Sequence, residues 1–142
     1  MACGRCVMSK PKRNILIQTP RGQISQYKTK DGKVVARLDW EAGFGPRASQ
    51  GFMNAQAFVD SECLRYMDPL TSRRTGYMIK SAILGTVVGS GTIEYLAPYA
   101  RKQYYEGKGD GGNRGRLWFE RMKTTKAETI RKGANMIAAN NK

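Results

Sequence analysis

The chain has 142 residues, a length that suits one domain, and 40 % of them are hydrophobic. Its 25 Lys and Arg residues outnumber 11 Asp and Glu residues, so the net charge is +14. Because the chain has no histidine, the sequence excludes Ser–His and Cys–His nucleophile pairs and histidine-ligated zinc.

The positive charge lies in the two terminal segments. Residues 1–30 hold seven basic and no acidic side chains, residues 101–142 hold eleven basic and four acidic ones, and residues 31–100 hold seven of each. A neutral centre with basic ends favours a packed body whose cationic surfaces face a polyanion, of which nucleic acid is the obvious one. A basic surface that only keeps the protein soluble is the alternative.

The first 13 residues predict a basic N-terminal tail, with neither a secretory signal nor an apolar run that could span a membrane. Cys3 and Cys6 form half of a zinc-ligand pattern whose other half is missing, and three cysteines do not suit a disulfide framework. We therefore interpret Cys3 and Cys6 as free thiols in a reducing compartment. Cys63 is interpreted as a small core residue.

The next segment has the alternating pattern of β-strands. Residues 14–18 form a short β-like run, and residues 23–27 and 35–40 alternate polar and apolar side chains around Asp31 and Gly32. Because Asp-Gly is a strong turn signal, this pattern predicts a β-hairpin.

A helix is predicted over residues 47–67 by apolar residues at three- and four-residue spacing, namely Phe52, Ala55, Val59, Cys63 and Tyr66. A polar loop over residues 70–76 and a short helix over residues 77–81 follow, with Ser72 or Thr75 as a candidate cap. Residues 85–95 predict a second β-hairpin that turns at a Gly-Ser-Gly sequence.

The last third predicts two helices and a loop. Residues 98–105 indicate a short helix with proline at its start, and residues 107–115, with five glycines, indicate a flexible loop. Residues 118–139 predict a long helix that Trp118 and Phe119 anchor in the core. The whole order predicts an α+β fold, with helices packed on one face of a small antiparallel β-sheet, in a single domain over residues 14–142.

No catalytic constellation is found in the sequence. The closest apolar-flanked pair of carboxylates is Asp39 and Glu41, the other acids are dispersed, and no nucleotide-binding or calcium-binding motif occurs. We therefore expect no enzymatic activity, no cofactor and no bound metal.

Two kinds of binding residue are candidates. Arg73 and Arg74 could grip a phosphate or a neighbouring subunit's carboxylate, or could lie in a solvated loop. Tyrosines that could stack on bases or contact a partner, but equally could pack in the core, are Tyr95, Tyr99, Tyr104 and Tyr105. The basic candidates for facing DNA or docking are Lys10, Lys12, Arg13, Arg21, Lys108, Arg114 and Arg116.

Three stretches in order resemble a family of tailed-bacteriophage minor capsid or head–tail joining proteins. Residues 69–81 (PLTSRRTGYMIKS) resemble its RTG-x-L-x-x-S element, and residues 95–107 (YLAPYARKQYYEG) resemble its Y-A-x-Y-x-x-Y element. Residues 118–123 (WFERMK) are similar to the start of the family's C-terminal helix.

The resemblance implies a structural virion protein of the phage neck, assembled in the host cytoplasm, that forms a ring at the head–tail junction. Such a ring, of six-fold or twelve-fold symmetry, completes or terminates the tail and lines the passage of genomic double-stranded DNA. Its other partners would be neck, connector and tail proteins, with residues 1–13 and 107–116 as docking arms. The alternatives are a small basic cytosolic nucleic-acid-binding protein and a ribosome-associated protein.

Overall fold

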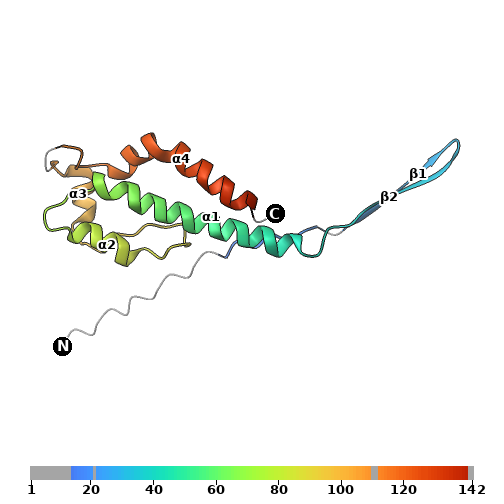
Figure 1. The fold of residues 1–142 in the computed structure, drawn as a ribbon, viewed down its shortest axis with the longest axis horizontal. Coiled ribbons are helices and arrows are strands. Elements are labelled where there is room, and N and C mark those ends of the chain that lie inside the picture. The colour runs from blue at the N-terminus through green and yellow to red at the C-terminus, as the bar shows by residue number, and fades with distance from the viewer. Residues whose placement is uncertain (1–13, 21, 110–111, 141–142) are drawn as a thin grey trace, which may run out of the picture.

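The computed structural model describes residues 14–20, 22–109 and 112–140. Its elements in chain order are β1 (Gln23–Thr29), β2 (Gly32–Leu38), α1 (Phe44–Met67), the 3-10 helix η1 (Asp68–Leu70), α2 (Tyr77–Gly85), α3 (Ala100–Glu106) and α4 (Trp118–Asn140). The fold is α+β, as predicted, with a two-stranded antiparallel sheet and a long C-terminal helix (Figure 1). The predicted basic tail, with Lys10, Lys12 and Arg13, and the candidate Arg21 lie outside the described residues.

Helices α1 and α4 pack side by side and run in opposite directions (Figure 1). With 24 residues, α1 is about 36 Å long, and α4, with 23 residues, nearly matches it. Their apolar stripes face each other, burying Ala55, Met122 and Ile130. Gly133 allows the close approach, because a Cβ there would come within 2.6 Å of the Phe58 ring. Both predicted long helices are confirmed, although α1 begins at Phe44.

The first turns of α1 extend past the end of α4 and therefore lack a partner helix (Figure 1). Phe52, the ninth residue of α1, is 48 % exposed, although the helical spacing assigns it to the buried stripe. The stripe therefore predicts which face of α1 packs, but not which of the residues on that face become buried.

The core is concentrated at the end of the helical body where α2, α3 and the start of α4 meet. Trp118 is 2 % exposed, and its ring centroid lies 5.5 Å from that of Tyr95 and 4.8 Å from that of Tyr104. Leu117, just before it, adopts a left-handed φ of 51°, and its N–H donates to the Tyr104 carbonyl at 2.9 Å. Phe119 is 39 % exposed, so its predicted role as a core anchor is wrong. Successive helical side chains diverge by about 100°, and one of such a pair turns outward.

The predicted second hairpin over residues 85–95 is wrong, because this segment contains no strand. It does turn at Gly89 and Gly91, whose φ values of 94° and 71° require glycine. Side chains replace a strand ladder in satisfying its backbone, since the Glu94 N–H donates to Thr86 Oγ1 at 3.1 Å.

Residues 14–18 are likewise not a strand, in contrast to the prediction. The Ile17 N–H donates to Ser49 Oγ on α1 at 2.9 Å, and the Ile17 carbonyl oxygen lies against Gly45. The segment therefore runs along the start of α1, where a helix offers it no strand edge.

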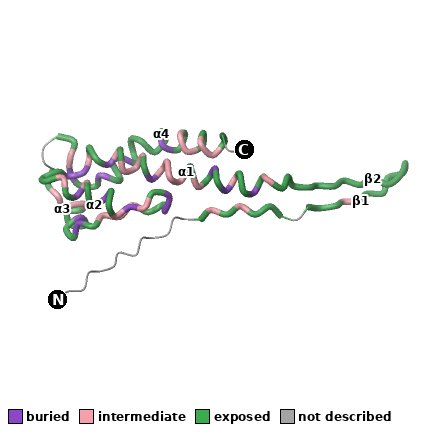
Figure 2. The backbone as a smooth tube through the Cα atoms, turned by 60° about the horizontal axis from the view of Figure 1, so that its bottom comes forward, coloured by how far each residue is buried: buried purple, intermediate pink, exposed green. Residues whose placement is uncertain are grey.

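The β1–β2 hairpin is confirmed and projects away from the helices, beyond the start of α1 (Figure 1). Every residue of β2 is exposed, and Figure 2 shows almost all of the hairpin in the colour of exposed residues. The helices pack on one another instead of on this sheet, because α1 and α4 already cover each other's apolar stripes. Among the described helices, none is long and apolar enough to cross a membrane.

Replacing the buried indole tests the position of the core. We expect Trp118→Ala to lower the free energy of unfolding by about 3–5 kcal/mol, because a large cavity would open among three elements. Phe119→Ala, next to it but half exposed, should cost only about 1 kcal/mol. Urea denaturation of both variants measures this, and equal losses would contradict the core described above.

Candidate functional site

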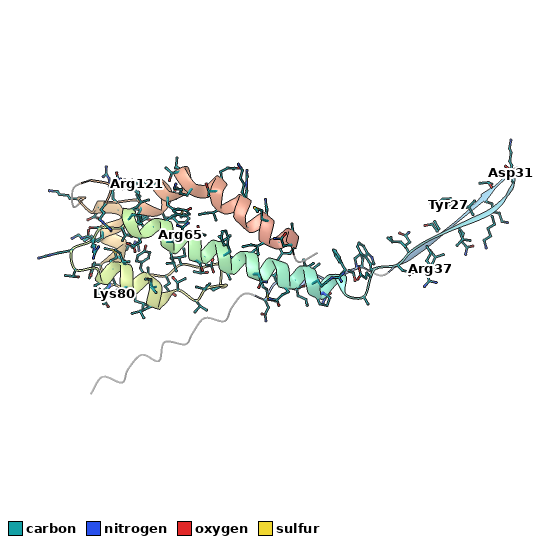
Figure 3. All side chains as sticks on the ribbon, in the orientation of Figure 1. Tyr27, Asp31, Arg37, Arg65, Lys80 and Arg121 are labelled. Carbon is teal, nitrogen blue, oxygen red and sulfur yellow. The ribbon has the colours of Figure 1, made fainter. Side chains whose placement is uncertain are left out.

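One face of the hairpin is apolar and uncovered. Directly opposed residues of paired strands share a face, and the register pairs Tyr27 with Val34, Ser25 with Ala36 and Gln23 with Leu38. Tyr27 is 63 % exposed, Val34 53 % and Leu38 56 %. We call Tyr27, Val34, Ala36 and Leu38 the apolar hairpin face, and Figure 3 shows Tyr27 far out on the hairpin and Asp31 at its tip.

A groove crosses the helical body between α1, residues 91–98, α3 and the start of α4, with a volume of about 720 Å³. A second hollow of about 340 Å³ continues it along α1 and α4. Both are lined by Val59, Cys63 and Phe119. Burial, together with the charges of Asp60 and Glu62, raises the pKa of the Cys63 thiol, which therefore stays protonated and weakly nucleophilic.

A buried carboxylate, which the sequence does not reveal as important, holds one wall of this groove. Asp60 is 3 % exposed, and its Oδ2 accepts hydrogen bonds from the N–H groups of Gly89 at 2.8 Å and Gly91 at 3.0 Å. Gln56 Nε2 donates to Oδ1 at 2.9 Å. All three bonds are internal, so Asp60 fastens the Gly-Ser-Gly turn onto α1. The sequence offers one signal for this role of Asp60, which is an acid on the buried side of a predicted helix, four residues after Gln56.

The four candidate tyrosines divide into two pairs. Tyr95 and Tyr104 pack against Trp118, and burial raises the pKa of both hydroxyls. Tyr99 and Tyr105 are 42 % and 60 % exposed. Core packing therefore accounts for the first pair, while the second pair faces two different hollows of the surface: Tyr105 lines the groove, and Tyr99 lines a separate cavity.

That separate cavity brings together candidates from three distant stretches of sequence. It has a volume of about 630 Å³ and lies between the start of α2, α3 and the segment after α3. Its lining consists of Ser72, Arg74, Thr75, Gly76, Tyr77, Met78, Tyr99, Gln103 and Lys108. We call it the cationic cavity. Arg74, Tyr99 and Lys108 are among the candidates predicted from the sequence, whereas Tyr77, whose ring centroid lies 6.4 Å from that of Tyr99, is not.

The turn into α2 forms the rim of this cavity. Gly76 has a φ of 78°, a left-handed conformation that glycine adopts without strain, and it is the cap residue of α2. The cap position therefore belongs to Gly76 and not to the predicted Ser72 or Thr75, although Thr75 Oγ1 accepts a long hydrogen bond of 3.5 Å from the Tyr77 N–H. Arg73 is exposed beside Gly76, outside the cavity lining. The RRTGY sequence thus places its second arginine, Arg74, and its tyrosine, Tyr77, in the lining of one cavity.

Arg114 has a structural role in the described part of the glycine-rich loop. Its Nη1 donates to the carbonyl oxygens of Asp68 and Thr71, both at 2.8 Å. The Gly115 N–H donates to the Leu70 carbonyl at 3.0 Å. This part of the predicted flexible loop is therefore fastened to η1, whereas Arg116 and Lys108 are exposed.

Comparison of the chain with protein-family models, with curated proteins and with solved structures found no match. Within residues 14–20, 22–109 and 112–140, no group of three or more Cys, Asp and Glu side chains is placed to hold a metal ion.

Loss of the Asp60 carboxylate tests how the groove wall is held. Asp60→Ala leaves two backbone N–H groups without acceptors, and we expect a loss of about 2 kcal/mol or more in the free energy of unfolding. The matched control is Glu128→Ala, which removes an exposed partner of Arg131 and should change stability by no more than about 0.5 kcal/mol. Chemical denaturation compares them, and two equal, small effects would refute the fastening role.

Proposed function

We propose that the chain is a structural virion protein of a tailed-phage neck. It forms a ring at the head–tail junction that completes or terminates the tail and lines the DNA passage. The observation that carries the proposal is the uncovered apolar face of a hairpin that stands clear of the chain's own helices. The three motifs that resemble the head–tail joining family supply the biological setting.

The hairpin requires a partner for physical reasons. A two-stranded hairpin alone is at best marginally stable in water, and this one exposes Tyr27, Val34 and Leu38 together with two unpaired strand edges. It lies at one end of the molecule, whereas α2 and α3 lie at the other (Figure 1). A contact between the hairpin of one copy and the body of the next is heterologous, and such contacts close into a ring when the rotation between successive copies closes.

The placement of the motifs agrees with this proposal. The RTG element forms the turn into α2, the tyrosine element spans α3, and the WFERMK element begins α4. The tyrosine and WFERMK elements meet where the Trp118 ring contacts Tyr95 and Tyr104, and Met78 of the RTG element belongs to the same core cluster. The motifs thus belong to one structural unit, as expected for sequence motifs whose residues pack against one another.

Polar substitutions on the apolar hairpin face test assembly. Tyr27→Ser combined with Val34→Ser should convert the ring to monomers in native mass spectrometry, because this cross-strand pair loses its apolar contact area. The melting temperature of the helical body should not change, since the hairpin does not pack on it.

The matched control for this test is Gln26→Ser with Val35→Ser, a cross-strand pair on the opposite face of the same hairpin. This variant should still assemble. A wild-type protein that stays monomeric at high concentration, or that is missing from the neck of purified virions imaged by electron microscopy, would refute the proposed function.

The second candidate function, a small basic nucleic-acid-binding protein, is favoured by the net charge of +14. The two functions predict different affinities. A subunit that lines a DNA passage should bind duplex DNA weakly and without sequence preference, and its affinity should fall about tenfold or more between low and physiological salt. Fluorescence anisotropy with duplexes of different sequence measures this. Sub-micromolar binding at physiological salt would favour the second function.

A further inference from the structure

We propose that the cationic cavity binds an unpaired nucleotide. The phosphate would lie between Arg74 and Lys108, and the base would lie against the rings of Tyr77 and Tyr99. This inference does not rest on the proposed ring, because it concerns the α2–α3 end of the molecule and not the hairpin.

The cavity has the charge and the size for a nucleotide. Its two charged lining residues, Arg74 and Lys108, are both cationic, and none of the lining residues that the structure describes is an acid. An arginine offers a planar fork that matches phosphate oxygens, and a lysine adds a mobile point charge. The volume of about 630 Å³ lies within the range of small-molecule sites, which runs from about 300 to 1,000 Å³.

The tyrosines indicate an unpaired base instead of a duplex. Tyr77 is 50 % exposed and Tyr99 42 % exposed, and their rings are tilted by 43° at a centroid distance of 6.4 Å. Each ring therefore keeps an accessible surface beside the cations. Bases within a duplex are already stacked on each other, whereas the bases of single strands stack on exposed aromatic side chains next to a basic groove. The amide of Gln103 in the lining adds a donor and an acceptor for a base edge.

The cavity walls are held in place without a ligand. Met78 anchors the start of α2 in the core at 6 % exposure, and Ala100 anchors the start of α3 at 8 %. The Gly107 N–H donates to the Gln103 carbonyl at 3.1 Å and so holds the chain where it leaves α3 toward Lys108. Such preorganisation lowers the ordering cost of binding.

The test measures binding of the full-length protein to fluorescent oligo(dT) and to a blunt duplex of equal length by anisotropy across a salt series. Wild type should bind oligo(dT) more tightly than the duplex. Thymidine monophosphate should compete, and inorganic phosphate at the same concentration should not. Tyr77→Leu should weaken oligo(dT) binding about fivefold or more and leave duplex binding unchanged. The matched control is Tyr105→Leu, an exposed tyrosine of the separate groove, which should have no effect.

The cations are tested by the double variant Arg74→Gln with Lys108→Gln. Loss of the contacts to this one phosphate of a single strand should make the slope of log affinity against log salt shallower by roughly 0.7. The control is Lys80→Gln with Lys132→Gln, which removes the same charge from exposed positions outside the cavity lining. Melting temperatures verify that all variants fold.

Two results would overturn the inference. One is that the wild type binds single strand and duplex equally and that both double variants lose affinity to the same extent. This result would mean that binding is general charge attraction. The other is no measurable binding of oligo(dT) at low salt. Either result leaves the proposed ring intact, because assembly is measured separately by native mass spectrometry on the hairpin variants.

Discussion

The contacts of Trp118 hold the helical body together. The indole belongs to the first residue of α4, and it packs on Tyr95 from the irregular segment before α3 and on Tyr104 from α3 itself. Met67 at the end of α1 and Met78 in α2 join the same cluster. One side chain thus connects elements that share few regular hydrogen bonds, and both surface cavities lie in the walls that these elements form.

Polar side chains satisfy the backbone of the irregular segments, as neighbouring strands do in a sheet. Asp60 accepts hydrogen bonds from two backbone N–H groups of the Gly-Ser-Gly turn, and Arg114 donates to the carbonyls of Asp68, which begins η1, and of Thr71, which follows it. A buried backbone group without a partner costs about 1–3 kcal/mol, so these side chains stabilise loops that could not otherwise lie against the helices. They position Tyr95 and the α3 segment, and with them the groove.

The molecule divides its surfaces between its two ends. The hairpin carries an uncovered apolar face, which suits a contact with another copy of the chain, and the α2–α3 end carries the cationic cavity with its exposed tyrosines. The hairpin also carries four basic side chains, Lys28, Lys30, Lys33 and Arg37, against Asp31 at its tip (Figure 3), and these are distinct from its apolar face. In the proposed ring, assembly and polyanion contact would therefore use different residues and could be altered separately.

The sequence by itself determined the elements whose signals are local. Helical periodicity located α1 and α4, the Asp-Gly pair located the first hairpin, and composition placed the charge in the terminal segments. Only the tertiary structure decided which side chains meet. In the structure, the expected second hairpin is a turn that Asp60 holds against α1. Phe52 and Phe119 are exposed. Of the four candidate tyrosines, Tyr95 and Tyr104 pack in the core, whereas Tyr99 and Tyr105 are exposed. The fold also brings Arg74 and Lys108, which are 34 positions apart in the chain, into the lining of one cavity, together with Tyr77. The physical reason is that periodicity identifies the apolar face of an element, whereas its burial depends on where the neighbouring elements begin and end.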